Sequence, residues 1–488
     1  MFKYNFILSL FLLSGLLIGL SSCDDWLEEF PRDAMASEMA MADIEGVEAT
    51  LAGLYNRLQG GTYNHREMNL VGELLADQMD ISLDNAGRLI NHPHNQEGAG
   101  FGIWNGRYDD INRLNMILHY IDDVEAAERT INQAKGETYA MRGYIYFDLL
   151  KIYARPYMYQ EPLVQGQPLG VIYKIEPFLG IDDRSFQERG TIDEGYQLVL
   201  DDFTSALEYL TDDNPDFPYR FTQVVVKALL ARLHLFMGNW EEAINFAEDV
   251  IDESPVSLVN AETREDYLTL FADAPGKESL FELGFTQADR PGMNTSVAGM
   301  ASFFPDLGRG YGDVILRQDL LNLLDQYGEE GHPAGEMYYV VEKGAQMCAF
   351  QDKYSSYRGE AYWDDIKILR IAEMYFIAAE AYAELDQLDD AGYYLQELRN
   401  HRNIGHLEID AGTKEDFIDL LLTEKRVEFF SEMSHRWFDL RRRGMDIPKG
   451  IPGVDSGEPL GFDDYRVVER IAISEISANE NCIQNPGY

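Results

Sequence analysis

Charged side chains are concentrated between Thr413 and Gly444, and their spacing could support acid–base chemistry. This stretch holds seven Lys/Arg and seven Asp/Glu, whereas the whole chain has 40 basic residues against 85 acidic ones. Glu424 and Glu428 lie one helical turn apart and close to an apolar face. Two carboxylates held together in this way can act as a general acid and a general base.

A structural role fits the same residues, and we favour it. A glutamate on the buried side of a helix needs a cationic partner, because an unpaired charge in an apolar setting costs several kcal/mol. We predict an internal ion-pair network whose members are Glu424, Glu428, Arg436 and Asp439, with Arg426 and His435 nearby. We expect Arg441 to Arg443 to form its solvated end.

No familiar catalytic or cofactor motif accompanies these carboxylates. The sequence contains no HExxH, GxSxG, P-loop or CxxC, and the GAGFG string at Gly98 lacks a following Rossmann-type helix. His92 and His94 could bind a metal, but no carboxylate converges on them. We therefore predict no enzyme, cofactor or metal. A glycosidase-type carboxylate pair stays open, because 85 acidic residues offer many combinations.

The overall charge limits the classes of partner. A net charge of −45 argues against nucleic acid, whose binding needs a basic surface, and against adhesion to anionic lipids through charge. Neutral sugars would not be repelled. A length of 488 residues with 45% hydrophobic residues is typical of a globular protein with one large core or two to three smaller ones.

The first residues form a targeting segment. Lys3 precedes an apolar run from Phe6 to Leu20, and the following LSSC resembles a bacterial lipobox. We predict a lipoprotein signal peptide over 1–22, lipidation of Cys23 and an acidic anchor leader over 23–36. Cys348 and Cys482 remain, either as a disulfide or as buried thiols.

Hydrophobic periodicity predicts a mainly α-helical fold. The expected helices span 37–58, 70–79, 103–121, 131–153 and 191–210. Thr191 with Glu194, and Thr413 with Asp416, have the spacing of N-terminal helix caps. The Asn-, Gly- and His-rich stretch from Asp80 to Gly102 reads as a long loop, and such loops are more often functional than idle.

Two later segments share a tetratricopeptide-like spacing of small residues. Ala231, Ala243 and Pro255 follow one another at twelve-residue intervals, and Ala379 and Ala391 repeat the first interval 148 residues further on. Such spacing lets two helices approach closely, although plain helical hairpins would fit equally well. This separation excludes a tandem repeat in sequence.

The intervening residues, about 256–365, differ in texture. Four prolines, many glycines and several aromatic residues predict a loop-rich excursion from the helical scaffold. Short strands are expected at 279–285 and 337–341, with another at 470–473. Binding groups usually lie on loops carried by a rigid scaffold.

Several blocks of the chain resemble the SusD/RagB family of outer-membrane nutrient-binding lipoproteins. They are IWNGRYDDINRLNMILHYI, DDIKILRIAEMYFIAAEAYAEL and VEFFSEMSHRWFDLRRRG, in addition to the lipobox. The departures LRNHRNIGH and SEMSHRW concern helix ends. The resemblance implies a single SusD-like helical domain over 37–488, with tetratricopeptide-like helix pairs and few short strands.

The resemblance also implies a function. It indicates a lipid-anchored protein on the outside of the outer membrane that captures oligosaccharides and delivers them to a SusC-type TonB-dependent transporter. A peptide-capturing relative on the same scaffold is the alternative. A secreted hydrolase using Glu424 and Glu428 is a third hypothesis.

A sugar site needs flat aromatic rings for C–H faces and polar groups for hydroxyls. In and before the Asn- and His-rich loop the candidates are Tyr63, Asp80, Asn85, Arg88, His92 and Asn95. In the excursion they are Phe303, Arg309, Tyr311 and Trp363. We assign Trp104, Trp240 and Trp437 to the core, because each lies on a helical stripe.

Overall fold

The computed structural model describes residues 40–180, 186–211, 216–288, 290–356, 361–449 and 457–488. The predicted signal peptide, Cys23 and the acidic leader lie outside these residues. Within the described ranges, no helix is long and apolar enough to cross a membrane.

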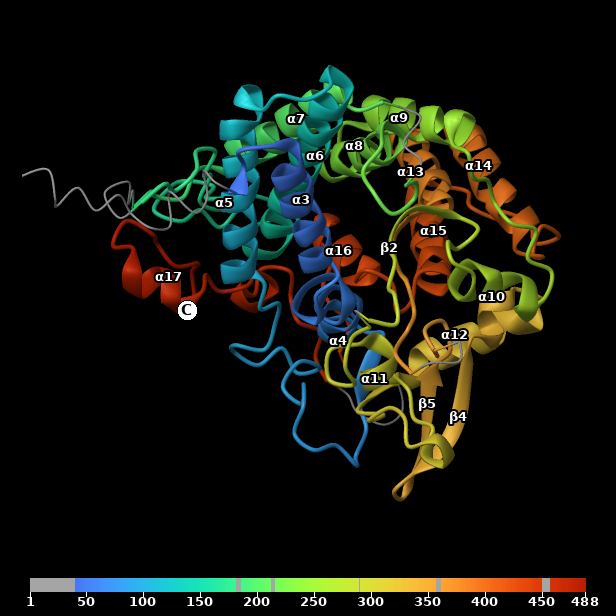
Figure 1. Ribbon diagram of the computed structural model, residues 1–488. Coiled ribbons are helices and arrows are strands. Elements are labelled where there is room, and N and C mark those ends of the chain that lie inside the picture. Colours follow the sequence, from blue (N-terminus) through green and yellow to red (C-terminus); the bar gives the residue numbers. More distant parts are fainter. Residues whose placement is uncertain (1–39, 181–185, 212–215, 289, 357–360, 450–456) are drawn as a thin grey trace, which may run out of the picture.

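Helices form most of the molecule, as predicted, and they line its upper part (Figure 1). The longer ones are α3 (Ile44–Leu58), α5 (Trp104–Tyr120), α6 (Glu128–Tyr153), α7 (Ile192–Tyr209), α8 (Gln223–Met237), α9 (Trp240–Glu253), α13 (Ile371–Glu384), α14 (Leu388–His401) and α15 (Lys414–Glu428). The shorter α16 (His435–Arg442) follows α15.

The two predicted helix pairs, α8–α9 and α13–α14, are neighbours in space despite their separation in sequence. Helix α9 packs on α13, and the stack continues through α8 and α7 to α6. Ala231, Ala243, Ala379 and Ala391 are all fully buried, as the spacing requires. Close approach recurs between α6 and α7, where a Cβ atom on Gly143 would lie 2.8 Å from the ring of Phe203.

Helix ends follow local sequence rules. Thr191 and Glu194 form a reciprocal capping box at the start of α7, and the Thr413 hydroxyl caps α15 by accepting from the Asp416 amide. Both predicted caps are confirmed. Asn403 takes the place of proline after α14 and adopts φ 58°, a left-handed conformation that asparagine tolerates.

Strands are few and short, as predicted. In the described part of the chain they form three antiparallel pairs: β1 (Met79–Ile81) with β3 (Val314–Leu316), β2 (Ser279–Leu283) with β6 (Ile366–Arg370), and β4 (Tyr338–Lys343) with β5 (Gln346–Gln351). Strands β2 and β4 confirm the two predicted in the excursion.

Three local predictions were wrong. The segment 70–79 is not one helix, because the π-helical turns at Gly61–His65 and Glu67–Val71 lead into the short α4 (Gly72–Leu75) and then β1. Residues 470–472 are not a strand, and α17 (Ile473–Ala478) starts there instead. The excursion is more regular than expected, since it contains α10 (Arg264–Ala272), α11 (Val297–Ala301) and α12 (Gln318–Glu329).

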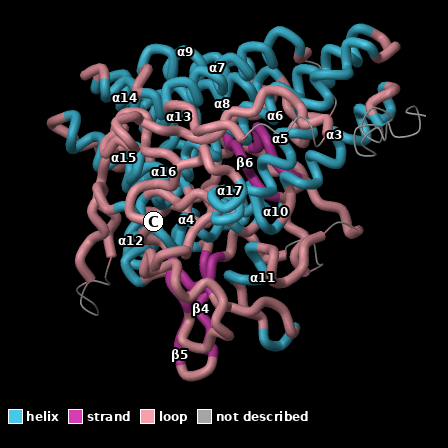
Figure 2. The backbone as a smooth tube through the Cα atoms, turned by 90° about the vertical axis from the view of Figure 1, so that its left-hand side faces the viewer, coloured by secondary structure: helices cyan, strands magenta, loops and turns pink. Residues whose placement is uncertain are grey.

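The excursion forms the lower part of the molecule. The hairpin β4–β5 projects away from the helical stack, with α11 and α12 above it (Figures 1 and 2). Strand β6 runs directly into α13, so the excursion returns to the scaffold without a connecting loop.

A buried ion cluster joins the excursion to the scaffold. Arg370, at the end of β6, donates to Glu278, Glu428 and Glu432 over 3.1, 2.8 and 2.8 Å. Arg402, after α14, donates to Glu278 and Glu428 over 2.8 and 2.9 Å. Each of these five side chains is at most 2% exposed. We call them the central ion cluster.

The cluster is electrically balanced. Lys353 donates to Glu432 over 2.7 Å, so three carboxylates meet three cationic side chains. His332 lies beside Glu428, and burial lowers its pKa to about 3, which leaves the imidazole neutral. Burial alone would raise the pKa of Glu428, but the charges of Arg402 and Arg370 outweigh it and hold that pKa well below its usual range.

Each predicted network member forms an ion pair, but with other partners than expected. Glu424 binds Arg399, Glu428 belongs to the central ion cluster, and Arg436 binds Asp77. Asp439 binds Lys425 and Arg442. These partners are mostly distant in sequence, so helical spacing did not reveal them.

The expected solvated end at Arg441 to Arg443 was wrong. Arg441 and Arg442 are 3% and 1% exposed. Arg442 and Arg443 bind the buried carboxylate of Glu380 in α13. Helix α16 is thereby fixed against the helical stack.

Removal of Glu428 should destabilise the protein strongly, because two buried guanidinium groups lose a partner. We expect Glu428→Ala to lower the free energy of unfolding by about 3–5 kcal/mol. Asp419→Ala, on the exposed side of α15, is the control and should change it by less than about 0.5 kcal/mol. Urea denaturation measures both, and equal effects would contradict this role.

Candidate ligand-binding site

Strand pairing brings the Asn- and His-rich loop to the excursion. Strands β1 and β3 are paired with Asp80 opposite Ile315. The ladder extends in both directions, since the Ser82 amide donates to the Asp313 carbonyl over 2.9 Å and the Arg317 amide donates to the Gln78 carbonyl over 3.0 Å. Candidate residues from two distant parts of the sequence therefore lie along one short ladder.

Arg88 and Tyr311 form a contact at one end of this ladder. The Arg88 guanidinium carbon lies 3.7 Å from the centre of the Tyr311 ring, and Arg88 Nε also binds the buried carboxylate of Asp313. Both side chains are half-buried, so a stacked, partly accessible polar and aromatic surface results. Asn85 accepts hydrogen bonds from the Gly87 and Arg88 amides, and its amide is therefore used in a local turn.

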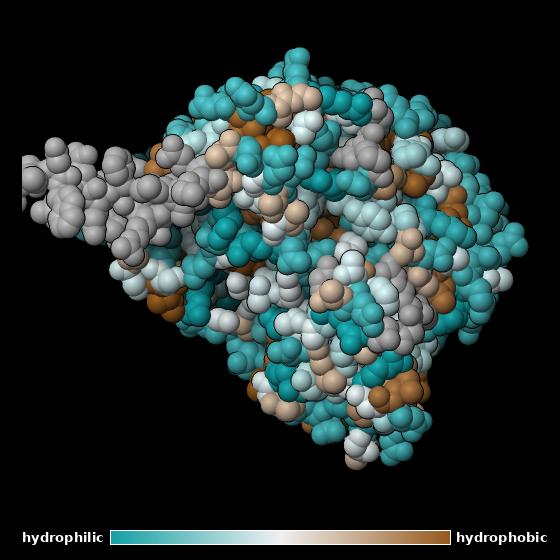
Figure 3. Space-filling model, in the orientation of Figure 1, coloured by the Kyte–Doolittle hydropathy of each residue, from teal (hydrophilic) through white to brown (hydrophobic). Residues whose placement is uncertain are grey.

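An aromatic cluster lies next to this contact. Phe304 stacks on Tyr339 with ring centres 5.2 Å apart, and the Tyr339 hydroxyl accepts from the Phe303 amide. Arg309 lies 5.6 Å from the Phe304 ring. The exposed side chains of Leu83, Leu307, Val340 and Met347 belong to the same loops and hairpin. In Figure 3, hydrophilic side chains cover much of the visible face, and hydrophobic patches are scattered over it.

A polar cavity of about 350 Å³ lies at the other end of the ladder. Two candidates line it, Asp80 and Asn95, together with Arg317, Lys449 and Arg466. We call it the Asn95 cavity. Both cationic side chains and the carboxylates of Asp80, Glu458 and Asp464 line it, so it offers both donors and acceptors.

Asn95 is unusual within this cavity. Its side chain is 2% exposed, and among the described residues neither its amide nitrogen nor its amide oxygen has a hydrogen-bond partner. Its backbone adopts φ 45°, in the left-handed region. Buried amides without partners are rare in proteins because desolvation of each polar atom costs free energy. A hydroxyl-bearing ligand could pair with both atoms once the side chain is uncovered toward the cavity.

Two neighbouring contacts position the cavity wall. Lys449 Nζ donates to the Leu75 and Ala76 carbonyls over 2.5 and 3.3 Å at the end of α4, and burial lowers its pKa to about 7. Arg436 binds Asp77 through two hydrogen bonds of 2.9 and 3.0 Å. Asp77 lies three residues before Asp80 in the chain. Arg436, a member of the predicted ion-pair network, therefore fixes the segment that leads into the site.

Tyr63, His92 and Trp363, which were also candidates, do not line the Asn95 cavity. Tyr63 is fully buried and donates to Asp148 over 2.6 Å, so it cannot contact a ligand in this structure, and that prediction was wrong. His92 is half-buried, with Nδ1 3.1 Å from the Leu89 carbonyl. Trp363 donates to the Phe285 carbonyl over 2.6 Å. Its neighbour Tyr362 accepts from the Gly310 amide, which links that segment to the aromatic cluster.

The structure also shows where the tryptophans assigned to the core and the two remaining cysteines lie. Trp104 and Trp437 are buried in the core, whereas Trp240 is only partly buried. Cys348 and Cys482 are both buried free thiols. No group of three or more His, Cys, Asp or Glu side chains suited to a metal occurs among the described residues.

Sequence reasoning missed Arg317, Lys449, Arg466 and Tyr339. Tyr339 falls within the predicted strand at 337–341, so alternation along that strand could have suggested it. Lys449 and Arg466 come from the extended chain after α16, which carries no periodic pattern. Nothing in the sequence pairs them with residues 80–95.

Comparison with known families now identifies the class of protein. Residues 25–235 match a family described as "Starch-binding associating with outer membrane", and residues 325–488 match one described as "SusD family". The chain belongs to the SusD/RagB family.

Two relatives match this chain over most of its length. SusD-like protein P38 of Formosa agariphila is 25% identical over 91% of this chain and 93% of its own. SusD-like protein P25 of the same organism is 22% identical over 97% and 98%.

Solved structures show the same fold. A SusD superfamily protein of Bacteroides thetaiotaomicron has a TM-score of 0.78 at 23% identity, covering 91% of this chain and all of its own. A SusD-like carbohydrate binding protein of Bacteroides vulgatus has a TM-score of 0.75 at 18% identity, covering 90% and 97%.

The glycine-rich end of the loop packs against a buried acid, Glu469. A Cβ atom on Gly100 would lie 1.8 Å from Glu469 Oε1, so any larger residue there would require the Glu469 carboxyl group to move. Burial raises the pKa of Glu469 to about 8. Burial raises the pKa of Glu73 to about 8 as well.

Protein stability should therefore fall between pH 4.5 and pH 8. Because folding raises these two pKa values, the folded chain keeps protons that the unfolded chain releases above pH about 4.5. The stabilising contribution is complete below that pH and is lost as pH approaches 8. Urea denaturation at pH 5 and pH 8 should show a smaller difference for Glu469→Gln than for the unmodified protein, with Glu73 supplying the remainder.

Glu480→Gln is the matched control, because Glu480 is exposed near the same chain end. It should leave the pH dependence unchanged. An unchanged pH dependence in Glu469→Gln would contradict the buried, protonated state of Glu469.

Proposed function

We propose that this protein captures oligosaccharides outside the cell and delivers them to a SusC-type TonB-dependent transporter, without modifying them. The Asn95 cavity is the observation that carries this proposal. The buried Asn95 amide has no partner among the described residues, and the cavity walls carry both donors and acceptors, which suits a neutral ligand rich in hydroxyl groups.

The length of the site favours an oligosaccharide over a single sugar. The Asn95 cavity adjoins Arg317 at one end of the ladder, and the Arg88–Tyr311 contact adjoins Asp313 at the other. Four residues of extended strand separate these ends by roughly 13 Å. A chain of sugars that spans both ends would place C–H faces on Tyr311 and hydroxyls on Asn95 and Asp80.

A binding role without catalysis is consistent with the state of the acidic pair considered first. Glu424 and Glu428 are both buried, and arginine side chains bind both carboxylates. A general acid or base must be free to exchange a proton with substrate. These residues therefore support the fold in our proposal.

Location at the outer membrane is supported by the matched family description, which refers to association with that membrane. We propose that Cys23 carries the lipid and that residues 24–36 form an acidic tether facing the exterior. The tetratricopeptide-like stack would serve contact with the transporter, and the loops of the excursion would serve the ligand.

Substitutions at the two ends of the ladder should weaken oligosaccharide binding. Isothermal titration against a panel of neutral oligosaccharides should identify a ligand, and Asn95→Ala and Tyr311→Ala should each weaken it about ten-fold. Among the described residues the Asn95 side chain has no hydrogen-bond partner, but its φ of 45° is unfavourable for alanine, so Asn95→Gly, which keeps that backbone conformation, is measured beside Asn95→Ala and melting temperatures are recorded for both.

Tyr393→Ala is the control, because this tyrosine is 60% exposed on α14, within the helical stack. It should not alter binding. Binding of peptides but not sugars would favour the peptide-capturing alternative. Release of reducing sugar would contradict a function without catalysis.

Replacement of the proposed acylated cysteine should release the protein from membranes. Cys23→Ala removes the only thiol that lipid attachment would use, and a single-residue change leaves the folded domain intact. Fractionation of expressing cells should show the unmodified protein with the outer membrane and Cys23→Ala in soluble fractions. Equal membrane association of both forms would contradict the anchor.

A further inference from the structure

A second cavity, of about 390 Å³, lies on the other side of the turn that bounds the Asn95 cavity. Asp464 lines both cavities, but otherwise their walls differ. The second cavity lies between the connector after α6, the start of α7 and the C-terminal segment. We call it the Arg155 cavity.

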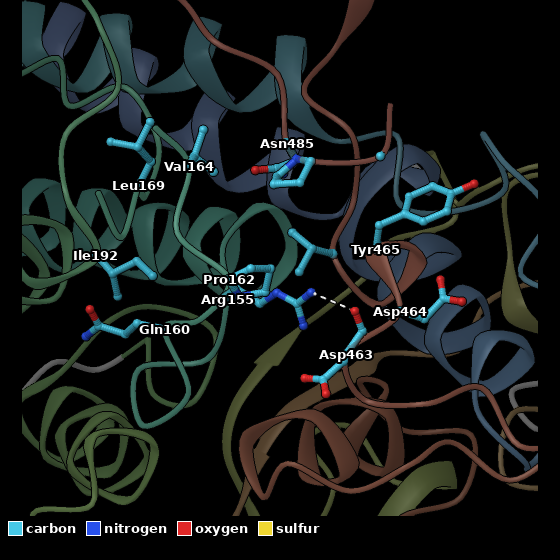
Figure 4. A pocket seen from close by; sticks show the side chains of 13 residues that line it. Arg155, Gln160, Pro162, Val164, Leu169, Ile192, Asp463, Asp464, Tyr465 and Asn485 are labelled. Carbon is cyan, nitrogen blue, oxygen red and sulfur yellow. Dashed lines mark hydrogen bonds between the residues drawn. The ribbon is translucent and has the colours of Figure 1, made fainter. Parts of the chain in front are cut away.

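One wall of the Arg155 cavity is mainly apolar, although Gln160 lies on the same side, and the facing wall carries two carboxylates (Figure 4). Pro162, Val164, Leu169 and Ile192 gather on one side in Figure 4, while Asp463, Asp464 and Tyr465 lie on the other. Arg155 lies between Pro162 and Asp463. A ligand here would contact hydrocarbon on one face and charge on the other.

Arg155 is buried, and no described residue forms a salt bridge with it. It is 9% exposed, and its guanidinium donates to the main-chain carbonyls of Phe462 and Asp463 over 2.9 and 3.3 Å. Asp463 and Asp464 are the carboxylates that face it, yet neither forms a salt bridge with it. Asp464 binds Arg466 through both of its oxygens.

Two more arginines around this cavity are also buried without a salt bridge to a described residue. Arg189 donates to the Leu169 carbonyl and to the Asn485 side chain, both at the cavity wall. Arg441 donates to the Lys151 carbonyl and, over 2.9 Å, to the Ala154 carbonyl beside Arg155. Both are less than 5% exposed, and within the described ranges neither is in a salt bridge.

This arrangement contrasts with the rest of the protein. The buried Arg370, Arg402 and Arg442 all bind carboxylates, in a chain whose net charge is −45. Glu469 also lies near Arg441, but burial raises its pKa to about 8, so it is uncharged at neutral pH. Asp463 and Asp464 face Arg155 without forming a salt bridge, so the positive charge of the three arginines is only partly compensated beneath the Arg155 cavity, and such charge is costly in a buried setting.

From this geometry we infer that the Arg155 cavity is a second binding site, specific for a small organic carboxylate with a C–H-rich face. The carboxylate accepts hydrogen bonds from Arg155 and offsets the charge of the three arginines. The C–H-rich face packs on Val164, Leu169 and Ile192. An acidic monosaccharide has both features, either free or at the end of a saccharide chain.

The test compares ligands that carry the sugar ring, the carboxylate or both. The mature protein is titrated with glucuronate, glucose and acetate, and binding is followed by NMR or calorimetry. Glucuronate should bind at least about ten-fold more tightly than either other ligand, because only it supplies both the carboxylate and the C–H face. A terminal glucuronate on a disaccharide distinguishes the chain-end source from the free acid.

Variants separate ligand binding from a purely structural role of Arg155. Arg155→Gln should weaken glucuronate binding about ten-fold, and Arg155→Lys should retain part of the affinity. Asp463→Asn should strengthen binding, because it removes a carboxylate of the cavity wall that repels the ligand. If Arg155 only stabilised the fold, this variant would gain no affinity. Melting temperatures confirm that each variant folds.

Two kinds of result would contradict a second binding site. Equal affinity for glucuronate and glucose, or unchanged affinity in both Arg155→Gln and Asp463→Asn, would overturn the inference. Asn95→Ala should leave glucuronate binding unchanged, because Asn95 lines only the other cavity. A failure at the Arg155 cavity is thereby distinguished from a failure of the proposed oligosaccharide site.

Discussion

The central ion cluster is the constraint on which the other parts of this structure depend. Arg370 and Arg402 bind Glu278, Glu428 and Glu432 where β2, β6, α14 and the end of α15 converge. These groups are withdrawn from water, so each charge is tolerated only because the others are present. Loss of one member leaves an uncompensated charge, and the excursion and the helical stack are therefore joined at a point that admits little alternative packing.

The junction between the excursion and the helical stack fixes the positions of the loops, so the loops can form a defined site. The stack from α6 to α14 provides rigidity, Arg436 holds Asp77 just before β1, and β1 pairs with β3 to align the long loop with the excursion. The Asn95 cavity and the Arg88–Tyr311 contact lie at the two ends of this ladder. A scaffold of this kind can hold buried polar groups in position for a ligand, as we propose for Asn95.

Local rules and family resemblance predicted much of the fold from sequence, but contacts between distant segments escaped them. The spacing of Ala231 and Ala243 and the cap at Thr191 depend on neighbours along the chain, and the structure confirms them. The pairing of Asp80 with Ile315 depends on tertiary packing, as do the partners of Glu428 and the burial of Tyr63. Among the site candidates, residue type correctly suggested polar and aromatic loops, but it did not distinguish accessible side chains from buried ones.

The central claim of this account is that a fixed helical scaffold holds loops that capture a sugar chain. Hydrogen–deuterium exchange of the mature protein, with and without a saturating oligosaccharide, tests it most directly. Residues 82–102 and 303–317 should become protected, while α8, α9, α13 and α14 should exchange as before. Protection confined to the helical stack, or no protection in either loop segment, would contradict the claim.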